Sequence, residues 1–313
     1  MDNKSQHKAW TERYRPQHIK NIVYPKHLRD YFDNIVTTKF IPSMILYSTS
    51  PGTSKTSTAK ALSIDVGVND YLYINASQDG RVAFLSEEIT KYVTVASMTD
   101  PFKVVILDEM EASSTVFQQA LKAFIEQYSK TCSFILTTNN LNKIIDPLKS
   151  RCIVQDFNMS SPEIRNELVP MMISRLEGIL KKEVVEYQHE TIVELVNTCY
   201  PDLRKMISRL QNDHIKHGAI TNEILNDDYD HQIFYQMLLQ KKIGDARKYL
   251  IENSCDYDIM YQNLFHEFIP LIKDPIVQNK LIVLIAKYLH MSGMALDKEI
   301  IFTALLIDMA DKY

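Results

Sequence analysis

Short apolar runs alternate with amphipathic stretches through the first half of this chain of 313 residues. Continuous apolar runs are typical of buried strands, whereas apolar positions spaced three and four residues apart are typical of helices. Strands are predicted at 44–47, 71–75, 104–107, 133–137 and 152–157. Helices are predicted between them, for example at 57–66 and 116–128. This alternation predicts an α/β fold in which helices flank a parallel sheet.

After residue 157 the strand signal fades and helical periodicity takes over. We expect Ser161 or Ser160 at an N-cap, with Pro162 at the first helical position, where proline is favoured. Further helices are predicted at 163–181, 189–199 and 203–212, and over most of the chain from 232 onward. Because a chain of this length exceeds what one core usually supports, more than one domain is expected. The predicted domains are α/β over 1–157 and helical over 158–228 and 229–313.

A turn rich in serine and threonine joins the first predicted strand to the next helix. Residues 49–56 read Thr-Ser-Pro-Gly-Thr-Ser-Lys-Thr, and a loop between a strand and a helix N-terminus can wrap nucleotide phosphates. Lys55 would reach the β- and γ-phosphates, and Thr56 would place its hydroxyl on Mg²⁺. The phosphate-loop pattern has glycine where this chain has Thr49 and Ser54, so taken alone the segment is more often only a turn. We expect Ser54 to be accommodated at negative φ as the helix begins.

Two adjacent acids follow the apolar run at 103–107. Ligands of open α/β sheets bind at the carboxyl ends of strands, where these acids would lie. Asp108 is placed to hold the Mg²⁺ shell, and Glu109 to orient and activate the attacking water. The alternative is a strand followed by a solvated acidic turn. The acids and the phosphate loop together make an ATPase the better interpretation.

Composition narrows the possible partners and compartments. The formal net charge of −4 does not indicate a strongly basic nucleic-acid-binding surface, so any contact with DNA must come from a local cluster or from several subunits together. No apolar run approaches the roughly 20 residues of a membrane span, and the first residues do not resemble a secretory signal. Scattered cysteines indicate neither a zinc site nor a disulfide framework and favour a reducing cytoplasm. They are Cys132, Cys152, Cys199 and Cys255.

Further motifs follow one another in a fixed order. They are Trp-Thr-Glu-Arg-Tyr-Arg-Pro at 10–16, Asp-Glu at 108–109 with Glu111 after it, Thr-Thr-Asn at 137–139, Ser-Arg-Cys at 150–152 and Pro-Asp-Leu-Arg at 201–204. With the phosphate loop, this set resembles the AAA+ ATPase subunits of sliding-clamp loaders. The resemblance is greatest to the large subunit of tailed-phage loaders and extends to the small subunits of replication factor C. It covers residues 10 to about 213, and the rest fits by length and helicity.

The resemblance implies a role for each motif. Asn139 is expected to touch the γ-phosphate or the lytic water, and Arg204 to be the second sensor. Arg151 is expected to enter the ATP site of the neighbouring subunit. The motif at 10–16 is expected to lie over the adenine. The expected nucleotide-binding residues are Tyr14, Arg15, Pro16, Pro51, Gly52, Thr53, Ser54, Lys55, Thr56 and Ser57.

Each motif also has a simpler interpretation. Trp10 and Tyr14 can anchor an N-terminal arm by burying their rings. Asn139 can belong to a turn after a strand, and Arg151 and Arg204 can form surface ion pairs. These alternatives do not explain the order and spacing of all six elements.

Departures from the family pattern and two weaker motifs leave alternatives open. Lys122 stands where the family has arginine, and a lysine keeps the charge but loses the bidentate fork. Arg81 is a candidate contact to DNA phosphates or a switch residue, although a solvated position fits nearly as well. Tyr92, Val95 and Met98 form either a patch that docks on the clamp or the core face of an amphipathic helix.

The resemblance implies an ATP-driven, DNA-stimulated clamp-loader subunit that uses ATP and Mg²⁺. ATP would close the subunits into a spiral that opens the clamp and grips DNA, and hydrolysis would release both. Residues 1–157 would form the ATPase domain, 158–228 a lid and 229–313 a collar. Its partners would be copies of itself, a distinct small subunit, the sliding clamp and primer-template DNA.

A bacteriophage protein acting in the host cytoplasm is expected, with no membrane partner. The alternatives are another AAA+ machine, such as a helicase loader or a protein remodeller, and a clamp-loader-like subunit that has lost hydrolysis.

Overall fold

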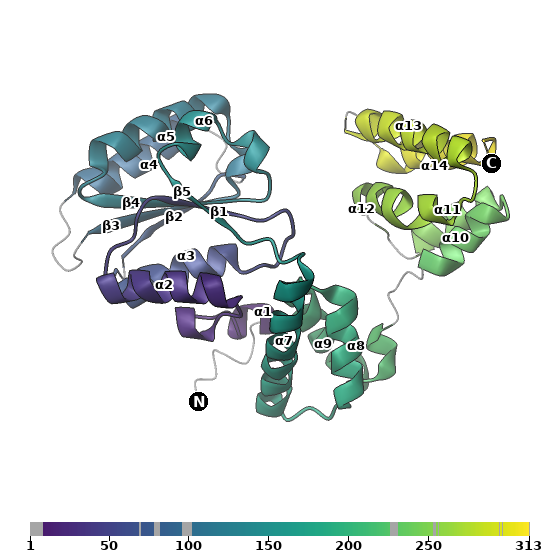
Figure 1. Ribbon diagram of the computed structural model, residues 1–313, viewed down its shortest axis with the longest axis horizontal. Coiled ribbons are helices and arrows are strands. Elements are labelled where there is room, and N and C mark those ends of the chain that lie inside the picture. The colour runs from purple at the N-terminus through teal and green to yellow at the C-terminus, as the bar shows by residue number, and fades with distance from the viewer. Residues whose placement is uncertain are drawn as a thin grey trace. The chain divides into compact units, whose positions relative to one another are not determined.

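The chain divides into two compact units, Met1–Leu225 and Asn226–Tyr313. We describe each unit by itself from a computed structural model (Figure 1). The structure describes residues 9–68, 70–77, 82–95, 102–225, 231–252, 255, 257–293, 295 and 297–312. Among these residues, no helix is both long enough and apolar enough to cross a bilayer.

The first unit is built on a five-stranded parallel sheet with the order β2-β3-β4-β1-β5. The strands are β1 (Met44–Tyr47), β2 (Leu72–Asn75), β3 (Lys103–Asp108), β4 (Cys132–Thr138) and β5 (Ile153–Asp156). Every residue of β3 and β4 is buried, as expected for central parallel strands covered on both faces. The predicted α/β fold is confirmed, and each predicted strand is present with ends that shift by at most one residue.

Helices cover both faces of the sheet (Figure 1). On one face lie α2 (Lys26–Thr38) and α3 (Lys55–Val66), and on the other lie α4 (Val82–Thr94) and α5 (Thr115–Tyr128). Successive residues of β3 point to opposite faces, so Val104 packs toward α2 and α3 whereas Val105 packs toward α4 and α5. Two apolar cores therefore hold the sheet rigid beneath its carboxyl edge.

Residues after the sheet form three helices around a third core. They are α7 (Pro162–Glu183), α8 (His189–Cys199) and α9 (Leu203–His217), followed by a 3₁₀ turn at Asn222–Leu225. The predicted cap of α7 is confirmed, because the Ser161 side chain accepts a hydrogen bond from the Ile164 N–H and Pro162 begins the helix.

The N-terminal arm packs on these helices. Trp10 opens α1 (Trp10–Arg13) and is only 3% exposed in their core. Its backbone N–H donates to Gln211 Oε1 at 2.8 Å, and its ring stacks on His214 with the ring centres 5.6 Å apart. The anchoring role proposed for Trp10 therefore describes its packing well.

The second unit is helical. Its helices are α10 (His231–Leu239), α11 (Ile243–Glu252), α12 (Tyr257–Asn263), α13 (Pro275–Ser292) and α14 (Lys298–Ala310). A π-helical turn at Leu264–Phe268 and a 3₁₀ turn at Ile269–Leu271 link α12 to the segment before α13. The core of this unit is rich in aromatic rings, including Phe234, Tyr235, Tyr261, Phe268 and Phe302.

Candidate nucleotide-binding site

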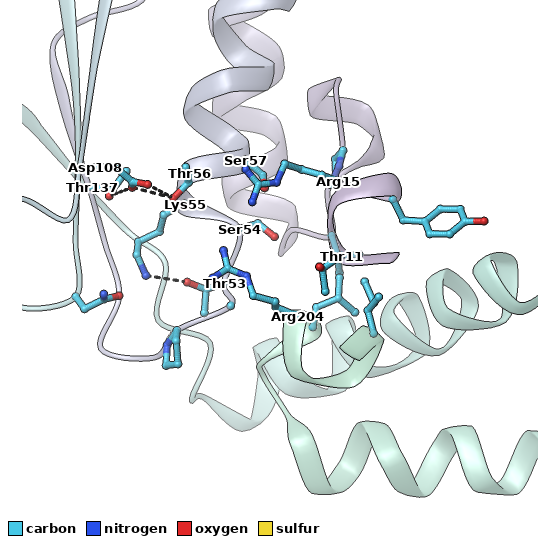
Figure 2. Close-up of a pocket in the computed structure, with 18 of the residues that line it drawn as sticks. Thr11, Arg15, Thr53, Ser54, Lys55, Thr56, Ser57, Asp108, Thr137 and Arg204 are labelled. Carbon is cyan, nitrogen blue, oxygen red and sulfur yellow. Dashed lines mark hydrogen bonds between the residues drawn. The ribbon is translucent and has the colours of Figure 1, made fainter. Parts of the chain in front are cut away.

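A pocket lies at the carboxyl edge of the sheet, between the N-terminus of α3 and the helices α1 and α9 (Figure 2). The strand register explains why the pocket lies at this edge, because it brings the carboxyl ends of neighbouring strands together. Asn75 of β2 lies beside Asp108 of β3, and Leu46 of β1 lies beside Thr137 of β4. The predicted residues that line the pocket are Tyr14, Arg15, Pro16, Pro51, Gly52, Thr53, Ser54, Lys55, Thr56, Ser57, Asp108, Glu109, Asn139 and Arg204. Sequence motifs scattered over almost 200 residues thus meet in one cavity.

The phosphate loop takes a left-handed path before α3 begins. Gly52 has φ +70° and Ser54 has φ +69°. The expectation that Ser54 has negative φ is therefore wrong. The backbone must turn in the left-handed sense immediately before Lys55 starts the helix, and an L-residue does this at a cost of about 1–2 kcal/mol. Glycine suits this position for its backbone freedom as well as its small size.

Lys55 is buried beneath the loop. Its side chain is 8% exposed, and Nζ donates to the Ser50 carbonyl at 3.2 Å and to Thr53 Oγ1 at 3.3 Å. Burial lowers the pKa of Lys55 to about 8, and the carboxylates of Glu111 and Asp108 oppose that shift. A triphosphate in the pocket would supply the negative charge that favours the ammonium form.

Asp108 is the most heavily hydrogen-bonded acid of the pocket. Thr56 Oγ1 donates to its carboxylate at 2.8 Å, the Tyr73 hydroxyl donates at 2.7 Å, and Thr137 Oγ1 also donates to it. Burial and the bond to Asp108 raise the pKa of Tyr73 above its ordinary value. Carboxylate and hydroxyl oxygens in contact fit Mg²⁺, which uses one or two carboxylates together with phosphates and water.

Glu109 leaves the strand in a different conformation from Asp108. Its φ is +57°, its N–H donates to Thr137 Oγ1 at 3.2 Å, and its side chain is exposed at the pocket. Asn139, at the end of β4, donates from Nδ2 to Glu111 Oε1 at 2.9 Å. Glu109 therefore has an exposed carboxylate that can meet water, whereas Asp108 has a buried carboxylate, oriented by three hydroxyl donors, that can hold a cation.

Helix α9 closes the pocket from the side opposite the sheet. Figure 2 shows Arg204 reaching from α9 toward Thr53 and Ser54 of the phosphate loop. Asp202 caps α9 by accepting from the Lys205 N–H at 2.9 Å. Its carboxylate also lies against the loop, because a Cβ added to Gly52 would come within 1.9 Å of Asp202 Oδ1.

The segment after α1 forms another wall. The Tyr14 hydroxyl donates to Glu183 of α7, and Arg175 of α7 donates to the Tyr14 carbonyl at 2.8 Å. Burial, together with Glu183, raises the pKa of Tyr14 to about 12. Tyr14, Arg15 and Pro16 line the cavity, whereas Trp10 is committed to the helical core.

Arg151 lies outside the pocket, after the short helix α6 (Asp146–Lys149). Its Nε donates to Glu126 Oε1 at 2.5 Å, so within this chain the arginine forms an ion pair with α5. The buried Gln118 of α5 accepts from the Ile145 N–H and donates to the Lys143 carbonyl. Helix α5 therefore braces the segment that runs from the pocket to Arg151.

The predicted clamp patch and DNA contact are described only in part. Arg81 and Met98 lie outside the described residues. Ile89 and Val93 form the buried face of α4, whereas Val95 is 65% exposed. The interpretation of Val95 as a core residue is therefore wrong.

Tyr92 is half-buried against the core beside α4 and donates from its hydroxyl to the Asp70 carbonyl at 2.5 Å. Lys122 of α5 is also half-buried.

The roles of several residues in and near the pocket were not identified from sequence. Tyr73 and Thr137 line the pocket and donate to Asp108. Asn158 lies at the start of the phosphate loop, where it accepts from the N–H and hydroxyl of Thr49 at 2.9 and 2.8 Å. The available signal was position: Thr137 opens the Thr-Thr-Asn motif at the carboxyl end of β4, and Tyr73 lies near the carboxyl end of β2, beside β3.

Comparison with known proteins assigns this chain to a family. The model of the AAA family (ATPase family associated with various cellular activities) matches residues 45–159. The sliding-clamp-loader large subunit of Enterobacteria phage T4 is 33% identical over 261 residues, which cover 82% of this chain and 81% of that protein. The chain belongs to the sliding-clamp-loader subunit family. As a member of this family with an AAA domain, it is an ATP hydrolase.

Other relatives agree with the assignment to the clamp-loader family. The replication factor C small subunit of Archaeoglobus fulgidus is 32% identical over 287 residues, which cover 85% of this chain and 86% of that subunit. The RuvB Holliday junction branch migration motor of Thermotoga maritima has a TM-score of 0.55 at 11% identity, covering 81% of this chain and 80% of that one. At that identity the likeness supports the AAA+ fold alone. The resemblance stated from the motifs is confirmed.

Proposed function

We propose that this chain is the ATPase subunit of a sliding-clamp loader that works as several copies together with a distinct small subunit. One observation carries the proposal. A single pocket gathers Lys55, Asp108, Glu109 and Arg204, while Arg151, the expected contributor to a second site, does not line it and is exposed on the same unit, paired with Glu126. A subunit that holds most of one ATP site and contributes to the next needs a neighbour.

Thr56 and Asp108 would hold Mg²⁺, and Lys55 would reach the β- and γ-phosphates. When bound, Mg²⁺ would neutralise developing charge on the phosphates. The residues themselves fit this arrangement, because the Thr56 hydroxyl and the Asp108 carboxylate are already in contact at 2.8 Å. Lys55 is buried, and burial lowers its pKa, so the negative charge of a phosphate would stabilise its ammonium form.

Glu109 would orient the attacking water and accept its proton, while Asn139 would position the water or the γ-phosphate. In this role Asn139 would have to exchange its bond to Glu111 for one to the nucleotide. Arg204 would contact the phosphates from α9. Closure of the helical segment 158–225 over the base would therefore depend on whether the γ-phosphate is present.

Arg151 would stabilise transition-state charge in the neighbouring subunit. ATP can drive a conformational change only by binding two states with different free energies, and a γ-phosphate shared between Lys55 and the neighbour's arginine supplies such a difference. Helices α7 to α9 would act as the lid and the second unit as the collar that holds subunits in a ring.

The partners proposed are the sliding clamp and primer-template DNA. With a formal net charge of −4, the chain would grip DNA only through local groups of several subunits, with Arg81 as a candidate. Val95, exposed directly after α4 ends at Thr94, belongs to the segment proposed to dock on the clamp. Such a machine would work in the cytoplasm of the host cell.

The test is ATP hydrolysis by the purified complex of this chain with its small subunit. Clamp and primed DNA added together should raise the rate well above that with either alone. A rate that is indifferent to both would overturn the clamp-loader proposal while leaving the ATPase assignment in place. Stimulation by a replicative helicase in place of the clamp would support a helicase loader instead.

A further inference from the structure

Tyr73 connects the edge strand β2 to the acid expected to hold the metal. Its hydroxyl donates to Asp108 Oδ2 at 2.7 Å, while Thr137 of β4 donates to Oδ1. Strands β2 and β4 lie on either side of β3, so the Asp108 carboxylate is held from both neighbouring strands. A carboxylate fixed through both oxygens cannot rotate freely about its side-chain bonds.

A second contact fixes the tyrosine ring itself. Lys60 Nζ lies 3.8 Å from the centre of the Tyr73 ring, as in a cation–π interaction. Lys60 lies one turn after Thr56 on α3. The ring is therefore held from the same helix that presents the Thr56 hydroxyl, and its hydroxyl is aimed at the acid that this threonine also contacts.

The donors to Asp108 differ in what they can do when a metal binds. A threonine hydroxyl that ligates a cation through an oxygen lone pair keeps its proton, so Thr56 would belong to the metal site itself and could still donate to Asp108. Tyr73 and Thr137 would touch only the carboxylate and not the metal. A hydrogen bond to an ionised carboxylate is stronger than a neutral one, and partners of this kind orient metal ligands.

We propose that Tyr73 is a positioning residue for the metal site: its hydroxyl holds the Asp108 carboxylate in the orientation that binds Mg²⁺ with the nucleotide. The inference rests on the proposed function, in which Asp108 and Thr56 hold the metal. Tyr73 does not touch the reacting atoms. It sets how much Mg²⁺ the enzyme needs, and it does not set how fast the saturated enzyme turns over.

The test is Tyr73→Phe in the full chain, because phenylalanine keeps the ring over Lys60 and removes only the hydroxyl. Mn²⁺ binding in the presence of ADP, measured by electron paramagnetic resonance, should weaken about tenfold. The Mg²⁺ concentration that gives half-maximal ATP hydrolysis should rise by a similar factor. The rate at saturating Mg²⁺ and the affinity for ADP in EDTA should stay within about twofold of the parent.

Tyr71→Phe is the matched control, because this tyrosine lies two residues earlier and packs against the core on the α2 and α3 face. It should leave Mn²⁺ binding unchanged. Unchanged Mn²⁺ binding in Tyr73→Phe would overturn the proposal. So would an equal loss at every Mg²⁺ concentration and in EDTA, since that pattern indicates a structural role.

Asp108→Asn separates failure of this inference from failure of the metal site. It should weaken Mn²⁺ binding far more than Tyr73→Phe does. If Asp108→Asn binds Mn²⁺ like the parent, the proposed metal assignment is wrong. If Asp108→Asn loses the metal while Tyr73→Phe keeps it, only the role of Tyr73 is wrong.

Discussion

The two sides of the nucleotide pocket are built by different means. The phosphate loop depends on backbone shape, with left-handed residues at Gly52 and Ser54. The acidic edge depends on side-chain chemistry, with Asp108 oriented by three hydroxyl donors and Glu109 left exposed. Substitutions in the loop should therefore act through shape and affect binding. Substitutions at the acidic edge should act through charge and affect metal binding at Asp108 and the chemical step at Glu109.

The largest effect on nucleotide binding is expected from a side chain that cannot adopt the left-handed backbone of the phosphate loop. Ser54→Val should abolish measurable nucleotide binding, because a β-branched residue at φ +69° is a strong outlier and would crowd the phosphates. Binding of a fluorescent ATP analogue checks this. Ser54→Ala, which adds no bulk, is the control and should still bind. Tight binding by Ser54→Val would show that the loop does not depend on shape in this way.

Next in size is a change of charge at the acidic edge. Glu109→Gln keeps the shape of the side chain and removes its basicity, so hydrolysis should fall by about 10²–10⁴ while ATP binding is retained. The variant should trap the complex with clamp and DNA. Single-turnover hydrolysis and nucleotide binding, measured on the same preparation, test the two halves of this expectation. Hydrolysis near the parental rate would remove Glu109 from its assigned role.

A third prediction concerns Arg151, which belongs neither to the phosphate loop nor to the acidic edge. Arg151→Ala should cost about 2–4 kcal/mol of transition-state stabilisation in the assembled enzyme and leave nucleotide binding by the isolated chain unchanged. Mixing Arg151→Ala with Lys55→Ala subunits should restore some activity, since certain interfaces then pair an intact pocket with an intact arginine.

Glu126→Gln is the companion variant, because it loosens the ion pair of Arg151 within its own chain without removing the guanidinium. It should not lower the rate. Absence of rescue in an assembly shown to contain both mutants would count against action on a neighbour.

The buried lysine gives a smaller effect that depends on pH. Because burial lowers the pKa of Lys55 to about 8 from 10.5, the unfolded chain binds more protons than the folded one between these values. This group therefore opposes folding below pH 8, and its penalty declines as the pH rises toward 10.5. The negative charge of nucleotide phosphates favours the protonated, charged form of Lys55. Binding above pH 8 should thus take up a fraction of one proton, measurable by calorimetry in buffers of different ionisation enthalpy, and Lys55→Met should abolish the uptake.

The smallest effect should come from removing the backbone strain at position 54 of the phosphate loop. Ser54→Gly removes the left-handed penalty but adds chain freedom to the unfolded state, so a net stabilisation below about 1 kcal/mol is expected. ATP hydrolysis should be retained. Urea denaturation of the parent and the variant measures the change. A clear loss of stability would mean that the Ser54 side chain contributes more than its backbone costs.

Local signals explain what the sequence predicted well. Strands such as Met44–Tyr47 are continuous apolar runs, and the start of α7 is set by Ser161 and Pro162, which act on their own turn. The pocket was predictable because parallel strands bring their carboxyl ends to one edge.

Other features arise only from tertiary contacts. The φ of Ser54 depends on the path of the whole loop, and the bond from Tyr73 to Asp108 depends on which strand lies beside β3. The exposure of Val95 depends on where the buried face of α4 falls. The spacing of apolar and polar residues along the chain encodes none of these three facts.

The contact between Gly52 and Asp202 has an evolutionary consequence. Position 52 has no room for a side chain while an aspartate caps α9, since the added carbon would overlap the carboxylate at 1.9 Å. The constraint runs one way: a larger residue at position 52 needs a smaller or displaced one at position 202, whereas position 202 can change while the glycine stays. Among descendants of this gene, lineages that keep the aspartate should keep the glycine, and any loss of the glycine should follow or accompany a change at position 202.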